Sequence, residues 1–95
     1  MINKIILTGF FVAMAYAQSP DELYNSALED LESGNISSAA SSFNSALEMD
    51  PTFAPAYIGL ARTSVRKGDL KGARENFIAA IEAEPENKEF RSEYE

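Results

Sequence analysis

The sequence of 95 residues contains no cysteine, no histidine and no tryptophan. Without histidine and cysteine it lacks the commonest general base, the thiolate nucleophile and the softer metal ligands. Without cysteine, no disulfide can support a small fold in an oxidising compartment. We therefore expect no catalytic residue, no cofactor site and no metal site, and we do not expect the chain to be an enzyme.

Carboxylates and hydroxyls are the remaining candidates for chemistry. The carboxylates Asp21, Glu22, Glu29, Asp30 and Glu32 have the spacing of a solvated helix face, and no glycine-containing loop of alternating oxygen ligands accompanies them, as a calcium site would need. The serines between Ser37 and Ser45 have no base partner that would activate a nucleophile. Both groups are best interpreted as helix surface.

Basic residues are also scarce, at 8 against 15 acidic ones, which gives a net charge of −7. Such a chain is repelled by the phosphates of nucleic acids, so we expect no nucleic acid partner. The charge is unevenly divided, because Gln18 to Pro51 holds seven acidic residues and no basic one. From Thr52 to Glu84 there are five basic residues against four acidic ones.

The one long apolar run lies at the N-terminus. Lys4 precedes the run Ile5 to Ala15, and Ala15-Tyr16-Ala17 supplies the small residues of a signal peptidase site. The run is shorter than the roughly 20 residues that a membrane-spanning helix requires. We predict a signal peptide over residues 1–17, an exported product that starts at Gln18, periplasmic or secreted, and no membrane insertion after cleavage. Retention as an anchor is the alternative.

Downstream of this leader the sequence repeats every 34 residues. Asp50-Pro51 and Glu84-Pro85 are separated by this distance. The same offset relates Ala27 to Ala61, Gly34 to Gly68, Ala39 to Ala73, Phe43 to Phe77 and Ala46 to Ala80. A repeat of this length predicts tandem supersecondary units that bury a continuous core by stacking.

Each unit has the signals of two helices joined by a tight turn. Ser19 can cap the first helix, with Pro20 at its first position, and Gly34 can end it in the left-handed conformation. Asn35 is placed to cap the next helix, and Pro51 follows that helix. Apolar residues recur at helical spacing and no window alternates as a strand does, so the predicted fold class is all-α.

The spacing resembles the tetratricopeptide repeat family, whose 34-residue unit has small residues at three fixed positions, one large aromatic and a proline near its end. Small residues stand at Ala27, Ala39 and Ala46 in the first unit and at Ala61, Ala73 and Ala80 in the second, with Phe43 and Phe77 as the aromatics and Pro51 and Pro85 as the prolines. The resemblance implies a domain over 18–95, a fragment of a right-handed α-solenoid. Its repeats would span about 20–53 and 54–87, and a short capping helix would span 88–95.

The resemblance also implies a function. Members of the family hold protein or peptide partners on a concave face that is lined by the first helix of each unit. Carried over to this sequence, that face contains Tyr24, Leu28, Leu31 and Glu32 from the first unit and Ile58, Arg62, Val65 and Arg66 from the second. Arg62 and Arg66 are four residues apart, so both could grip a carboxylate of a bound peptide or pair with the acidic unit of a second copy.

Two hypotheses follow. The first is a non-catalytic interaction module in an exported, periplasmic complex, which binds a peptide or helix on the concave face. The alternative is a scaffold that self-assembles by stacking repeats end to end, supported by the opposite charge of its two units. Two units are fewer than the three usually needed for a stable array, so we expect a homo-oligomer or marginal stability. The last residues, with Phe90 and Tyr94 four apart, would form the shortened cap.

Overall fold

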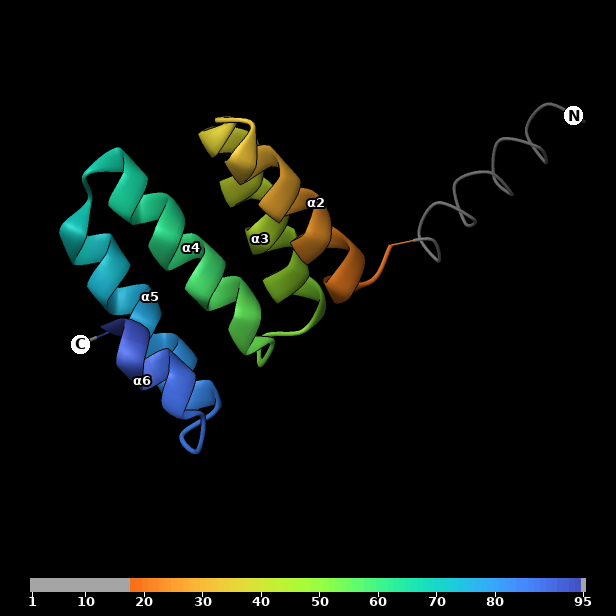
Figure 1. The fold of residues 1–95 in the computed structure, drawn as a ribbon. Helices are drawn as coiled ribbons and strands as arrows, with labels where there is room; N and C mark the ends of the chain where they lie inside the picture. The colour runs from red at the N-terminus through yellow and green to blue at the C-terminus, as the bar shows by residue number, and fades with distance from the viewer. Residues whose placement is uncertain (1–17, 95) are drawn as a thin grey trace, which may run out of the picture.

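The computed structural model describes residues 18–94, and the predicted signal peptide lies outside the described residues. In this range the chain forms five helices and no strand (Figure 1). The helices are α2 (Pro20–Glu32), α3 (Ile36–Met49), α4 (Ala54–Lys67), α5 (Leu70–Ala83) and α6 (Lys88–Tyr94). The predicted all-α fold class is confirmed.

The helices pack as two hairpins in sequence, followed by a single short helix. Helices α2 and α3 pack against each other, as do α4 and α5, and α3 contacts α4 between the hairpins. Figure 1 shows α2, α4 and α6 side by side in one layer, with α3 and α5 in a second layer. The first helix of each hairpin therefore contributes to the same surface.

The turn inside each hairpin is made by glycine. Gly34 and Gly68 have φ angles of 83° and 80°, the left-handed region that other residues enter only at a cost. In both turns the amide of the following residue donates to the carbonyl oxygen five residues earlier, at 2.8 Å in the first unit and 2.9 Å in the second. The two turns are thus the same helix-ending motif, repeated at an interval of 34 residues.

The helix starts differ from one unit to the next. The side chain of Ser19 accepts from the amide of Glu22 at 3.2 Å, which confirms the predicted cap of α2. Asp69 caps α5 by accepting from the amide of Gly72 at 2.9 Å. Asn35 stands at the start of α3, but its side chain makes no capping bond, so that detail of the prediction was wrong. Asn35 and Asp69 have similar backbone angles, so the difference lies in the side-chain conformation.

Small residues bring the helices close together, and one aromatic side chain fills the space between the hairpins. Ala27, Ala39 and Ala46 are fully buried, as is Phe43. A Cβ atom built on Gly59 of α4 would lie 2.2 Å from Cε1 of Phe43, far below van der Waals contact. The ring of Phe43 therefore lies directly against the backbone of α4, and Gly59 is the residue that permits it.

Between residues 18 and 94, none of the helices combines the length and the apolar character needed to cross a membrane. The structure thus places one continuous helical array after the leader, and its first helices share a face on which the candidate site lies.

Candidate partner-binding groove

An open groove with a volume of about 670 Å³ crosses the layer of first helices, and we call it the first groove. Its walls include Tyr24 of α2, Ile58 and Arg62 of α4, and Phe90 and Glu93 of α6. It combines aromatic rings with one ion pair, a composition suited to an apolar segment that carries a charge.

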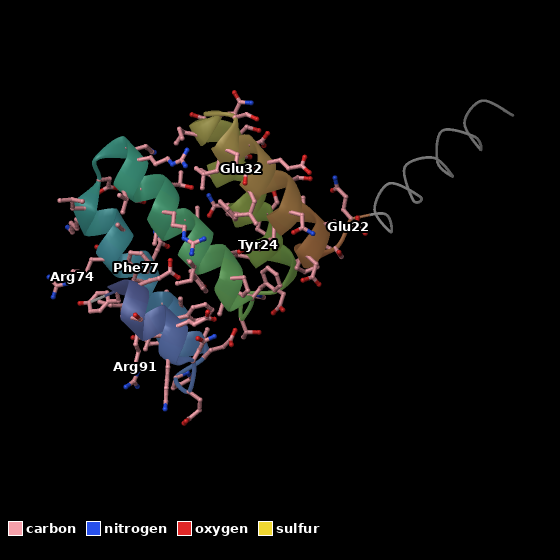
Figure 2. The ribbon with its side chains drawn as sticks, viewed as in Figure 1. Glu22, Tyr24, Glu32, Arg74, Phe77 and Arg91 are labelled. Carbon is pink, nitrogen blue, oxygen red and sulfur yellow. The ribbon has the colours of Figure 1, made fainter. Side chains whose placement is uncertain are left out.

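Tyr24 is fixed in the groove by two neighbouring rings. Its ring centroid lies 5.8 Å from that of Phe43 and 5.9 Å from that of Phe53, the latter edge to face at 76°. Such pairs contribute about 1 kcal/mol beyond the area that they bury. Figure 2 labels Tyr24 on the side of α2 that faces α4. Because core aromatics support it, Tyr24 presents a rigid, partly exposed ring to the groove.

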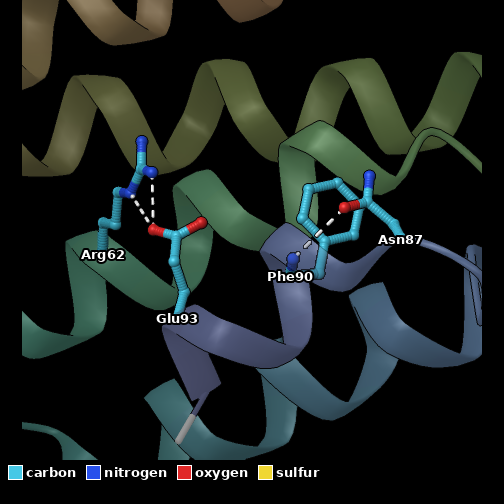
Figure 3. A network of polar contacts seen from close by, with 4 residues as sticks. All are labelled: Arg62, Asn87, Phe90 and Glu93. Atoms are coloured by element: carbon cyan, nitrogen blue, oxygen red, sulfur yellow. Dashed lines mark hydrogen bonds and ion pairs between the residues drawn. The ribbon is translucent and has the colours of Figure 1, made fainter.

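Arg62 is bound to Glu93 across the groove (Figure 3). Its Nε and NH2 atoms lie 3.0 Å and 2.5 Å from the same oxygen, Oε1 of Glu93. The two side chains are 47% and 32% exposed, so water and salt screen the pair, and it contributes less than about 1 kcal/mol. The guanidinium of Arg62 is thus held in position by a contact that another carboxylate can replace at little cost.

The turn before α6 sets the position of this helix. Asn87 caps α6 by accepting through Oδ1 from the amides of Glu89 and Phe90, at 3.0 Å and 3.3 Å. The amide of Asn87 donates to the carbonyl oxygen of Glu84 at 3.0 Å, and a bond of the same length closes the equivalent turn before α4. Helix α6 therefore begins where the first helix of a third unit would begin.

Three of the predicted site residues lie largely beneath the surface. Leu31 and Ile58 are only 6% and 3% exposed. Leu28 is half-buried and packs against the core of the first unit. Leu28 and Leu31 therefore stabilise the layer of first helices, while Ile58 also lines the floor of the groove.

The remaining predicted residues lie away from the first groove. Glu32 is the exposed last residue of α2, and Val65 lines a second, separate depression. Arg66 donates from NH1 to the carbonyl oxygen of Leu31 at 2.6 Å. Because the last turn of α2 has no basic side chain of its own, Arg66 supplies the positive charge that favours this helix end. The structure therefore gives Arg62 and Arg66 different partners.

Phe90 and Glu93 were not among the residues predicted for the site. A signal for them exists, since the 34-residue offset places residues 88–94 in the register of residues 54–60 of α4. The predicted pairing of Phe90 with Tyr94 on one surface is also modified. Phe90 lines the first groove, whereas Tyr94 contacts Phe77, with ring centroids 6.4 Å apart, and lines the second depression.

Hairpins that repeat at an interval of 34 residues and present their first helices to one groove define a helical repeat protein. Residues 30–92 match the family model described as tetratricopeptide repeat, and the chain belongs to this family. Its members generally mediate protein–protein interaction and are typically not catalytic. A comparison with curated proteins found none that matches the chain.

Proposed function

We propose that the chain is a non-catalytic interaction module that binds a peptide or a helix of a partner protein in the first groove. The observation that supports the proposal most directly is the arrangement of Tyr24, Ile58 and Arg62 from two different hairpins around one open volume. Isolated surface residues do not form such a volume, and clefts of this size are where short peptide segments bury their side chains.

The lining of the groove indicates the chemistry of the ligand. Tyr24 and Phe90 favour an apolar or aromatic side chain, and Arg62 favours a carboxylate. Glu93 occupies Arg62 in the structure, so a ligand carboxylate exchanges one ion pair for another and loses little on binding. The proposed ligand is therefore an apolar segment with an acidic residue, or with its own C-terminal carboxylate, beside the apolar contact.

The proposal includes export. It is supported by the leader over residues 1–17, with cleavage after Ala17, and it places the module in the periplasm or outside the cell. The mass of the protein isolated from its native compartment tests this directly. A product that starts at Gln18 is expected, and a product that keeps residues 1–17 would support the membrane anchor instead.

A scaffold that assembles end to end remains the second candidate, because one unit is wholly acidic and the other holds an excess of basic residues. Sedimentation of the full chain at several concentrations, in low and high salt, separates the two functions. A mass that rises with concentration and falls with salt supports the scaffold. A mass that stays constant supports the interaction module.

The partner can be identified by crosslinking from inside the groove. A photoreactive phenylalanine analogue in place of Tyr24 should capture a partner in the native compartment, whereas the same analogue at the exposed Ser41 of α3 should not. With the captured partner in hand, Arg62→Glu should weaken binding about tenfold or more, because it replaces a charge-assisted bond with repulsion.

Arg91→Glu is the matched control, because Arg91 is exposed and points away from the array on α6 (Figure 2). It makes the same change of charge outside the groove and should leave the affinity within about twofold, as is usual for an exposed charge. Equal effects of the two substitutions would show that the net charge matters and the groove does not.

A further inference from the structure

A second groove, with a volume of about 480 Å³, lies at the end of the array where α4, α5 and α6 meet. We call it the end groove, and its lining residues are Val65, Leu70, Ala73, Arg74, Phe77 and Tyr94. Leu70 is 70% exposed, Val65 is 49% exposed and Tyr94 is 37% exposed. Apolar side chains gathered at such exposure mark a surface that a partner covers.

The repeat itself shows what covers the equivalent surface one unit earlier. By the 34-residue offset, Val65 and Phe77 correspond to Leu31 and Phe43, which are 6% and 0% exposed. The difference comes from the covering helix. Helix α4 has 14 residues and extends along α3, whereas α6 has seven residues. The end groove is therefore the part of α5 that corresponds to the part of α3 beneath the second half of α4.

The rim of the end groove carries charge that its counterpart lacks. Arg74 lines the groove, and Lys71 lies three residues earlier on the same side of α5, exposed. The equivalent residues of α3 are Ala40 and Ser37, both uncharged. The second half of α4 is basic, so a helix of that sequence would be repelled from the end groove. An acidic helix would be attracted.

We propose that the end groove receives an amphipathic helix of a partner protein, apolar with small residues on one face and acidic along its flank. This helix lies on α5 as the second half of α4 lies on α3, and it completes a third unit. Its carboxylates pair with Lys71 and Arg74 while its apolar face covers Leu70 and Phe77. The site is separate from the first groove and adds a second partner-binding surface to the proposed function.

A second copy of the chain fits the end groove less well. The helix of a second copy that corresponds to α4 is α2, and the face of α2 that would be turned to the groove carries Glu22, Asn25, Ser26 and Glu29, all exposed and polar. These residues offer charge complementarity but no apolar side chain that would cover Leu70 or Phe77. Partner helices with an apolar face fit the groove better.

The test uses the full chain and a labelled 14-residue peptide with the sequence of α4, in which Arg62→Glu, Arg66→Glu and Lys67→Glu make the flank acidic. Fluorescence anisotropy should show that this peptide binds at least about tenfold more tightly than the unmodified α4 peptide, as expected for exchanging repulsion for ion pairs. In the chain, Leu70→Asp should abolish binding of the acidic peptide, and Arg74→Glu should reverse the preference between the peptides.

Leu70 is largely exposed, so helicity should be unchanged in the Leu70→Asp variant, and circular dichroism checks this. Because a free peptide of this length is barely helical, the acidic sequence is also joined through a flexible linker after Glu95, which raises its local concentration. Hydrogen exchange of α5 should then slow, and Leu70→Asp should remove the protection.

Three results overturn the proposal: equal affinity for the two peptides, binding that survives Leu70→Asp, or a dimer of the full chain that Leu70→Asp dissociates, which would make a second copy the occupant. In the chain, Arg62→Glu alters the first groove and should leave the acidic peptide bound. Loss of binding in that variant would place the peptide in the first groove. Failure of the end groove is thereby distinguished from failure of the proposed function.

Discussion

Replacing Gly59 by alanine tests the closest contact between the two hairpins. Two effects oppose each other. Alanine favours a helix interior over glycine by about 1 kcal/mol. Against this, the new methyl group would lie 2.2 Å from Cε1 and 2.3 Å from Cζ of Phe43, more than 1 Å short of ordinary contact. The ring must move, and it is fully buried, so its neighbours must move with it.

Overpacking of this kind costs about 1–3 kcal/mol, and the depth of the overlap places Gly59→Ala near the upper end of that range. After the helix-propensity gain, we expect a net destabilisation of about 2 kcal/mol. In a domain of this size each kilocalorie shifts the melting temperature by about 4–8 °C. The melting temperature of the full chain should therefore fall by about 10 °C.

The assay is thermal and urea unfolding of the full chain, followed by circular dichroism. Asn25→Ala is the matched control, since Asn25 is the exposed residue of α2 at the same place in the repeat, and there alanine should stabilise by up to about 0.5 kcal/mol. Phe43→Leu combined with Gly59→Ala completes a double-mutant cycle with a coupling of at least about 1 kcal/mol. A Gly59→Ala chain as stable as the wild type would refute the reasoning.

Two further predictions concern the turns and helix starts, and both are measured as free energies of unfolding in urea. Gly68→Ala should destabilise by about 1 kcal/mol through backbone strain alone, because no atom lies within 4 Å of the added methyl group; a loss above about 3 kcal/mol would mean that the turn does more than end α4. Asp69→Ala should cost about 1 kcal/mol by removing the cap on Gly72, whereas Asn35→Ala should cost less than half of that; equal losses would contradict the assigned caps.

The fold could be predicted from the sequence because its signals are local and repeated. The 34-residue offset identified the units, and Gly34 and Gly68 identified the turns, since a left-handed residue after a helix is a requirement of the backbone itself. The buried alanines followed from the same spacing. What the sequence did not specify was the side-chain conformation of Asn35, which depends on local hydrogen bonds and not on residue type.

The candidate site was predictable only in part. Tyr24, Ile58 and Arg62 came from the family resemblance, and the structure places all three around the first groove. The partner of Arg66 could not be predicted, because a backbone carbonyl oxygen has no signature in the sequence. The exposure of Val65 was equally hidden, since it depends on how far the next helix extends and not on α4 itself.

Helix α6 joins two surfaces that are otherwise separate. Glu93 faces the first groove and pairs with Arg62, and the next residue, Tyr94, contacts Phe77 at the end groove. The helix has seven residues and none of them is buried, so little holds it in one position. A ligand that draws Glu93 away from Arg62 also disturbs Tyr94. Occupancy of one groove thus changes the affinity of the other, and thermodynamic linkage makes that effect the same in both directions.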